Sequence, residues 1–420
     1  MSTVQKPVNK TTEERLQEEL QSKKLQLHWL LQITKAINYN FSQKQLLDVY
    51  EHVLTSQLKV GKLVLFILNG TWKNLLMFGV DENFSSYTAT TILNDLNAGH
   101  TIENTSALWE KTFELVTPVF HKDRPLAYGL VGSFADGDST SGGTRKELHS
   151  FIQTITNLIV VAIENNKMAE EQIKQAAIRK ELELAAQMQS LLFPPSLPCN
   201  EHYELHATYL PHQEVGGDYY DYISLSEDEF AICMADVSGK GMSAALLMAN
   251  FQANLHALIR QPKDCPLTEL AHQLNSRVYA SAKGEKFITF FIGIYNIRSR
   301  ELQYFNAGHN PPFLVHHKVV YQLTEGSTGL GMFEKLPFIN VGKLLIPDGA
   351  LLLCYTDGVT ELENESGEAF GEERLQTFLL QNLNADTNYV HSALLDKLND
   401  FRQTKPHLDD VTLLSCWFKH

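Results

Sequence analysis

The chain has 420 residues, 44% of them hydrophobic, and a formal net charge of −14 at pH 7. This length predicts two or three domains, each able to bury an ordinary apolar core. The acidic balance argues against nucleic acid and anionic membranes as partners, because both call for a basic surface. The N-terminus is polar and no apolar run reaches about 18 residues, so we expect neither a signal peptide nor a membrane span, and a cytoplasmic location.

The chain has five cysteines, an odd number, and they are scattered without C-x-x-C spacing. This pattern predicts neither a disulfide framework nor a zinc site. Three of them lie inside apolar runs and are expected to be small core residues: Cys233, Cys354 and Cys416. The other two are Cys199 and Cys265.

The first part of the chain alternates helical and strand patterns. Helices are predicted at 13–38 and 43–59, and a long helix from about Arg145. Between them we expect two strand pairs, 63–70 with 74–80 and 113–120 with 126–134. This order resembles a GAF domain. We therefore assign residues 1–38 to an N-terminal tail and helix, and residues 39–165 to a GAF-like sensor domain.

The long helix continues past that domain with a narrow apolar stripe. Its members recur at steps of 4, 7, 4 and 3: Ile173, Ala177, Leu184, Met188 and Leu191. This spacing favours a coiled-coil-like helical linker over residues 166–195 that pairs with a second copy as a homodimer. The alternative is a helix packed on its own domain. Pro194 and Pro195 end the helix, since proline cannot continue it.

The second half of the chain places aspartates at the ends of apolar strands. The strand at 230–235 leads into Asp236, and the strand at 350–355 leads into Asp357. Asp218 follows two glycines, and Asp409 and Asp410 precede a terminal strand. Ser243 is expected to cap a helix that ends at Ile259, and residues 286–296 and 301–315 to form a strand hairpin.

Carboxylates that converge at strand ends repel one another unless cations lie between them. A ligand set made only of oxygen atoms selects a hard ion, so we expect Mn²⁺ or Mg²⁺. A pair of such ions can activate a water and neutralise phosphate oxygens. The aspartates therefore predict a site that holds two ions and hydrolyses a phosphate ester.

Five segments then carry a family resemblance. In chain order they read GGDYYD, ADVSGKGMSAALLM, NAGHNPP, YTDGVTE and DDVT. Together they resemble the SpoIIE/RsbU branch of the PPM-type serine/threonine phosphatases. The resemblance implies an α+β fold, with residues 196–420 as a β-sandwich of two antiparallel sheets flanked by helices. It also implies hydrolysis of phosphoserine or phosphothreonine by a metal-activated water, on a STAS-type anti-sigma-factor antagonist.

The resemblance also implies roles for single residues. Asp218, Asp236, Asp357 and Asp409 would be catalytic metal ligands, with Asp236 as the bridge and the Val237 carbonyl as a further ligand. The choice between Asp409 and its neighbour Asp410 stays open, and we prefer Asp409.

A second set of residues has less direct roles. Asn306, Gly308 and His309 resemble a family loop with a structural or substrate-edge role, and a general-acid role for His309 is the alternative. The eukaryotic branch has a histidine where this chain has Ser238, which leaves the acid for the leaving group unassigned.

Two other classes of function compete with this interpretation. A non-catalytic docking protein on the same fold would be expected to lack metal ligands, and this chain keeps them. A nucleotidyl cyclase or nuclease also holds metals on carboxylates, but the antiparallel strand pattern and the motif order do not fit it.

Overall fold

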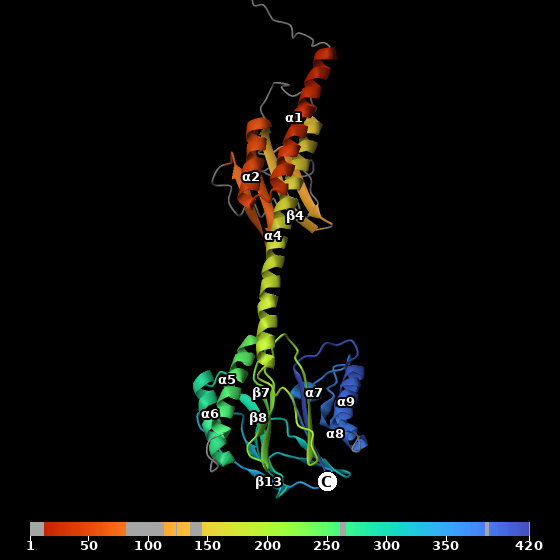
Figure 1. The fold of residues 1–420 in the computed structure, drawn as a ribbon. Helices are drawn as coiled ribbons and strands as arrows, with labels where there is room; N and C mark the ends of the chain where they lie inside the picture. Colours follow the sequence, from red (N-terminus) through yellow and green to blue (C-terminus); the bar gives the residue numbers. More distant parts are fainter. Residues whose placement is uncertain are drawn as a thin grey trace, which may run out of the picture. The chain divides into compact units, whose positions relative to one another are not determined.

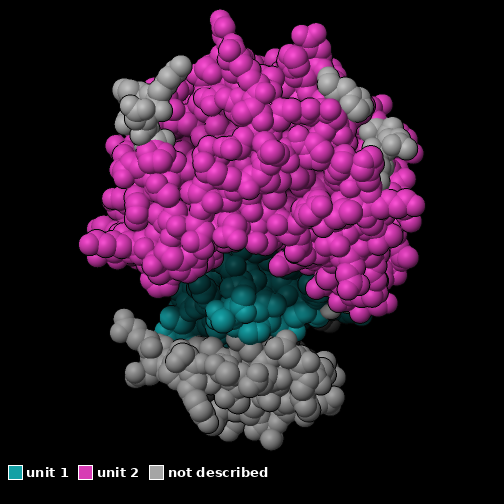
Figure 2. All heavy atoms as spheres, turned by 90° about the horizontal axis from the view of Figure 1, so that it is seen from below, with its two compact units in different colours: residues 1–176 teal, residues 177–420 magenta. Residues whose placement is uncertain are grey.

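The computed structural model describes residues 12–80, 113–122, 124–134, 145–260, 266–382 and 386–419. The chain divides into two compact units, residues 1–176 and 177–420, which Figure 2 shows in different colours. Among the described residues, no helix combines the length and the apolarity that crossing a bilayer requires.

The N-terminal unit is a four-stranded antiparallel sheet with helices on one face (Figure 1). Its strand order is β2-β1-β4-β3. The two predicted strand pairs are confirmed, since β1 pairs with β2 and β3 with β4. The elements of this unit are α1 (Thr12–Asn38), α2 (Gln43–His52), η1 (Val53–Gln57), β1 (Val60–Asn69), β2 (Thr71–Phe78), β3 (Leu115–His121), β4 (Arg124–Phe134) and the first part of α4 (Arg145–Ser190).

Both faces of the central strand β1 are apolar, because its side chains alternate between two clusters. Leu63 and Leu65 pack under the helices, together with Ile155 of α4. Val64 and Phe66 pack on the opposite face of the sheet. Period-two alternation therefore fixes which residues the helices cover.

The second helix differs from its prediction. An α-helix was expected over 43–59, but α2 ends at His52 and a π-helical turn, η1, follows. In that turn the Leu58 N–H donates to the Val53 carbonyl at 3.1 Å. The wider turn accommodates two successive core residues, Val53 and Leu54, both fully buried.

The C-terminal unit is a two-sheet sandwich, with α5 and α6 on one side and α8 and α9 on the other (Figure 1). One sheet has the order β11-β10-β14-β15-β5, and the other β12-β9-β8-β7-β6 with β13 beside β9. This confirms the predicted α+β sandwich. One detail was wrong: the short strand β12 pairs with β9 in parallel.

The bounds of the elements in this unit follow from the backbone hydrogen bonds. The strands are β5 (Tyr203–Leu210), β6 (Tyr219–Ser224), β7 (Glu229–Val237), β8 (Ile288–Asn296), β9 (Glu301–Ala307), β10 (Phe313–His316), β11 (Val319–Gln322), β12 (Gly326–Ser327), β13 (Gly342–Leu345), β14 (Leu351–Tyr355) and β15 (Val411–Phe418). The helices are α5 (Met242–Ile259), α6 (Leu267–Ala282), α7 (Asp357–Thr360), α8 (Gly371–Gln381) and α9 (Thr387–Arg402).

Alternation along the strands builds three apolar layers. In β7, Phe230, Ile232 and Met234 face the other sheet, whereas Ala231 and its alternate neighbours pack under α5. Side chains of the strand β15 alternate in the same way, so that one set lies between the sheets and the other packs under α8 and α9. The apolar cysteines predicted for the core, Cys233, Cys354 and Cys416, are all buried in these layers.

Two local predictions were wrong. The helix α5 begins at Met242 with Gly241 at its N-cap, and no side chain caps it, so Ser243 lies in its first turn. The expected strand 301–315 is divided, because β9 ends at Ala307 and β10 pairs with β14 in the opposite sheet. The turn between them carries the chain from one sheet to the other.

The layer between the sheets predicts a large stability effect at Leu414. Leu414 is 1% exposed and lies opposite Cys354 in the β14–β15 register. We expect Leu414→Ala to lower the free energy of unfolding by about 2–5 kcal/mol, because it leaves a cavity between two well-packed sheets. Leu408→Ala, at a side chain that is 50% exposed, should cost less than about 0.5 kcal/mol. Urea unfolding of the full chain measures both, and equal losses would contradict this packing.

Candidate functional site

Strand alternation brings polar residues to one end of the sandwich. On β7 the face that points between the sheets ends at Asp236, after Phe230, Ile232 and Met234. On β15 the same face begins at Asp410 and continues at Thr412. Thr356, at the end of β14, precedes Asp357, which opens the one-turn helix α7. The fold therefore places carboxyl groups where the layer between the sheets meets its end.

Asp218 lies deepest in this group. It is 2% exposed, and its Oδ2 accepts hydrogen bonds from the hydroxyls of Thr356, at 2.8 Å, and Thr412. Its carboxyl group also lies close enough to that of Asp236 for the two negative charges to repel each other. Asp218 is thus oriented by donors from β15 and from the end of β14, although it precedes β6.

Tight backbone packing holds the segments together. A Cβ added to Gly358 would lie 1.9 Å from the carbonyl oxygen of Asp410, so only glycine allows this approach. A Cβ on Gly217 would lie 3.0 Å from the carbonyl oxygen of Val237. The predicted backbone ligand, Val237, therefore lies directly beside the turn that carries Asp218.

Asp409 and Asp410 have different surroundings. The two carboxylate oxygens of Asp410 accept from the backbone N–H groups of His212, at 2.8 Å, and Gly217, at 2.9 Å. The Oδ2 of Asp409 instead lies 2.6 Å from the Lys240 ammonium, and its side chain is 39% exposed. Asp410 thus holds the backbone of two other segments, whereas Asp409 pairs with a lysine and accepts from the neighbouring Asp410 N–H at 2.9 Å.

Burial and mutual repulsion raise the pKa values of three aspartates. Burial, followed by the charge of Asp236, raises the pKa of Asp218 well above its usual range. Burial followed by the charges of Asp357 and Asp409 raises the pKa of Asp236 to about 7. Burial and Asp409 raise the pKa of Asp357 to about 6. Negative charge is therefore costly at this place, and a cation would relieve it.

The chemistry of these side chains fits a hard divalent cation. The donors are all oxygen atoms, and the Lys240 ammonium shows that the group already attracts positive charge. As the side chains stand, no three acidic, histidine or cysteine groups among the described residues form a ready ligand set for an ion. Three of these carboxylates instead contact groups of the protein itself. Asp410 accepts from a backbone N–H, Asp218 accepts from a threonine hydroxyl, and Asp409 pairs with a lysine ammonium.

The remaining predicted site residues form a rigid corner beside this group. Asn306 accepts from the His309 N–H at 2.8 Å and donates to the carbonyls of His309 and Leu323. His309 is 3% exposed, its Nδ1 lies 2.9 Å from the Thr289 hydroxyl, and burial lowers its pKa to about 3. A neutral, enclosed imidazole supports a structural role rather than a general acid. Gly308 lies in the same turn, with φ of 63°.

Ser238 is also occupied by the backbone. Its hydroxyl accepts from the Phe287 N–H at 2.9 Å, and its own N–H donates to the Phe287 carbonyl. This pairing supports a structural role for Ser238 at the start of the turn before α5. It leaves the leaving-group acid unassigned, as in the sequence.

Sequence reasoning missed three residues that shape the site: Thr356, Thr412 and Lys240. A signal was present for Thr412, because alternation from Asp410 puts it on the same face of β15. Lys240 lies in the motif that follows Asp236, but its partner, Asp409, is far away in the chain. Only the folded structure reveals that pair.

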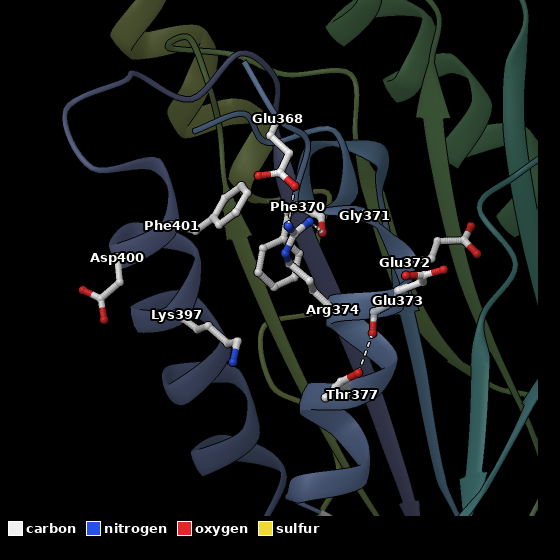
Figure 3. Close-up of a pocket in the computed structure, with 10 residues that line it drawn as sticks. All are labelled: Glu368, Phe370, Gly371, Glu372, Glu373, Arg374, Thr377, Lys397, Asp400 and Phe401. Atoms are coloured by element: carbon white, nitrogen blue, oxygen red, sulfur yellow. Dashed lines mark hydrogen bonds and ion pairs between the residues drawn. The ribbon is translucent and has the colours of Figure 1, made fainter. Parts of the chain in front are cut away.

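Pockets among the described residues of the C-terminal unit include one at the site and one apart from it. The smaller is lined by the site and its turns: His212, Gln213, Val215, Gly216, Asp236, Gly239, Lys240, Gly241, Asp409 and Asp410. The larger, of about 880 Å³, lies between α8 and α9 and shares no lining residue with it (Figure 3). There Arg374 pairs with Glu368 at 2.7 Å and lies over the Phe401 ring. The carboxylate of Asp236, whose pKa is raised to about 7, lines the smaller pocket, so the chemistry favours that one.

The raised pKa values predict how stability depends on pH in the absence of metal. Unfolded aspartates titrate near about 4, whereas Asp236 and Asp357 titrate at about 7 and about 6 in the folded chain. Between these values the folded chain binds more protons than the unfolded chain. The contribution of these two aspartates to the free energy of unfolding is therefore largest below about pH 4, and it is lost as the pH rises toward about 7.

Calorimetry in a chelator tests this. We expect the melting temperature of Asp236→Asn to exceed that of the wild type at pH 8 and to depend less on pH, because the variant removes one of the repelling charges. Asp396→Asn, at an exposed site on α9, should behave as the wild type. An Asp236→Asn variant less stable than the wild type at pH 8 would contradict this electrostatic picture.

The sequence and fold of this region match known proteins. Residues 226–419 match the family described as Stage II sporulation protein E (SpoIIE). Protein IcfG of Synechocystis sp. is 28% identical over 273 residues, which cover 59% of this chain and 43% of IcfG. Phosphoserine phosphatase RsbU of Bacillus subtilis is 27% identical over 242 residues, covering 57% of this chain and 70% of RsbU.

Two further comparisons bear on family and fold. Phosphoserine phosphatase RsbP of Bacillus subtilis is 30% identical over 190 residues, covering 44% of this chain and 46% of RsbP. The chain thus spans less than half the length of IcfG and RsbP. The solved SiaA-PP2C domain of Pseudomonas aeruginosa shares the fold, with 20% identity and a TM-score of 0.52 over 59% of this chain and 98% of that domain. Residues 226–419 are therefore similar to the SpoIIE family, and this region resembles phosphatases of the SpoIIE/RsbU type.

Proposed function

We propose that this protein is a metal-dependent protein serine/threonine phosphatase of bacterial signalling. One observation carries the proposal: aspartates from four separate segments meet at one end of the sandwich, where burial and repulsion raise the pKa values of three of them. Such a gathering is costly in folding, and divalent cations would make it favourable.

Named residues would hold the ions. Asp218, Asp236 and Asp357 supply carboxylates, with Asp236 between the others, and Asp409 completes the set once Lys240 releases it. The Val237 carbonyl is the backbone donor, and Asp410 keeps the turn around Gly217 in place. Two Mn²⁺ or Mg²⁺ ions bound there would activate a water and neutralise phosphate charge.

The proposed substrate is a phosphoserine or phosphothreonine on a protein. RsbU and RsbP, which match this chain, are named phosphoserine phosphatases. We propose a small STAS-type anti-sigma-factor antagonist as the substrate, in the cytoplasm. Lys240 lines the pocket at the carboxylates and its side chain is 46% exposed, so a phosphorylated side chain presented by another protein would meet a cation there.

Removing single carboxylates tests the enzyme. We expect phosphate release from phosphoserine protein to require Mn²⁺ or Mg²⁺, and to fall at least about 100-fold in Asp236→Asn and Asp357→Asn, equal to about 2.7 kcal/mol of barrier. Asp409→Asn should lose more activity than Asp410→Asn if Asp409 is the ligand. A malachite-green assay with chelator, Mn²⁺ and Mg²⁺ arms measures all four variants.

The same assay separates the rival function. A non-catalytic docking protein would bind the phosphoprotein without releasing phosphate, with or without metal. Activity that persists in chelator, or that survives in Asp236→Asn, would refute the proposed mechanism.

We further propose that residues 39–165 form a GAF-like sensor and that residues 166–195 form a dimer contact that carries its state to the phosphatase domain. The helix α4 runs without a break from Arg145 to Ser190. Its stripe is exposed in the single chain, with Ile173 at 71%, Leu184 at 49% and Met188 at 65%. Large apolar side chains exposed at coiled-coil spacing favour pairing with a second copy.

A charge placed in that stripe should separate the copies. We expect the double variant Ile173→Glu with Leu184→Glu to sediment as a monomer, because pairing would bury unpaired carboxylates. The matched control, Gln172→Glu with Gln175→Glu, adds the same charge at exposed positions off the stripe and should sediment as the wild type. Analytical ultracentrifugation of the full chain measures both. A wild type that is monomeric at micromolar concentration would contradict the proposed dimer.

A further inference from the structure

The last turn of α4 contains one buried polar side chain among exposed neighbours. Gln189 is 8% exposed, whereas Met188 is 65% and Leu191 75% exposed. Burying an amide is unfavourable unless its donor and acceptor are both satisfied. The side chain of Gln189 is therefore held by a specific partner, and that partner lies outside α4.

The partner is a single backbone residue, Gly216. The Gln189 Nε2 donates to the Gly216 carbonyl at 2.8 Å, and the Gly216 N–H donates to the Gln189 Oε1 at 3.2 Å. One side-chain amide thus satisfies both polar groups of one residue, as a neighbouring strand would. Gly216 lies two positions before Asp218, in the turn that enters the candidate metal site.

Gly216 is enclosed on its other side. A Cβ added there would lie 2.1 Å from the Asp410 Oδ2 and 2.1 Å from the Tyr209 hydroxyl. The next residue, Gly217, donates its N–H to the same Asp410 oxygen at 2.9 Å. The turn is therefore clamped between Gln189 and Asp410, and neither contact can shift far without moving Asp218.

The end of the helix is itself anchored. Phe193 packs its ring against Tyr209 and Tyr220, with ring centroids 5.1 Å and 5.0 Å apart. The Leu192 N–H donates to the Gln189 carbonyl at 2.9 Å. Since the backbone on both sides of Gln189 is held, its amide presents a fixed edge to Gly216.

We propose that Gln189 is a positioning residue, whose amide sets the turn at Gly216 and thereby the orientation of the Asp218 carboxylate. Gln189 acts through the backbone and touches no reacting group. The part of this inference that concerns metal affinity rests on the proposed function. The part that concerns the turn does not.

The test uses the full chain with Gln189→Met, which keeps the length of the side chain but removes both hydrogen bonds. The matched control is Gln187→Met, two residues earlier and exposed. In the absence of metal, we expect amide hydrogen exchange at Gly216 to be about 10-fold faster in Gln189→Met, because losing a hydrogen bond worth about 1.4 kcal/mol shifts local opening by that factor. Gln187→Met should exchange as the wild type does.

Titration calorimetry with Mn²⁺ alone gives the second measurement. We expect Gln189→Met to bind Mn²⁺ about 10–100-fold more weakly, as groups that orient metal ligands do when removed. Gln187→Met should bind as tightly as the wild type. A wild type that binds no Mn²⁺ would refute the proposed function, while the exchange measurement would still decide the role of Gln189.

Gln189→Glu covers the case in which Gln189→Met does not fold. Its carboxylate still accepts from the Gly216 N–H but cannot donate to the Gly216 carbonyl, so we expect exchange at Gly216 faster than in the wild type. If the folded Gln189 variants exchange at Gly216 as slowly as the wild type and Gln187→Met, the inference is wrong.

Discussion

The structure of the C-terminal unit depends on one electrostatic constraint. Several carboxyl groups are withdrawn from water at the end of a sandwich, close enough to raise one another's pKa values. This arrangement opposes folding, so apolar burial elsewhere must exceed its cost. The three apolar layers supply that burial, because the inner strands of both sheets are covered on both faces. The fold thus stabilises a charged site that is unfavourable by itself.

The same strand alternation that builds the layers also orients the site. Thr412 follows Asp410 on the face of β15 that, further along, buries Leu414 between the sheets. Thr356 continues the corresponding face of β14, and both hydroxyls reach the Asp218 carboxylate. Because these threonines end an apolar layer, their rotamers are confined by packing. Asp218 is accordingly held by the core itself, which explains how a residue outside any strand obtains a fixed orientation.

Local sequence signals predicted most of the elements and singled out the aspartates that the fold brings together, because an apolar run that ends in aspartate is visible within a few residues. They failed where a distant segment decides the outcome. The division of 301–315 into two strands depends on β14, because β10 pairs with it in the other sheet. The Lys240–Asp409 pair and the Gln189–Gly216 contact join residues 169 and 27 positions apart. The π-turn at Val53 depends on tertiary packing that no local propensity records. The helix α5 begins after Gly241 without a side-chain cap, so the expectation that Ser243 caps the helix placed its start too late.

Asp218 is oriented from three directions at once, and this has consequences for control. Its carboxylate is fixed by threonine hydroxyls, its backbone turn by Asp410, and the residue two positions before it by the end of α4. The threonines and Asp410 belong to the sandwich and move only with it. The contact from α4 is different, since it consists of two hydrogen bonds from one side chain on a helix whose preceding turns are exposed. If Gln189 has the proposed positioning role, a change at that helix would reach the Asp218 turn through this one side chain, while the hydrogen bonds from the sandwich stay in place.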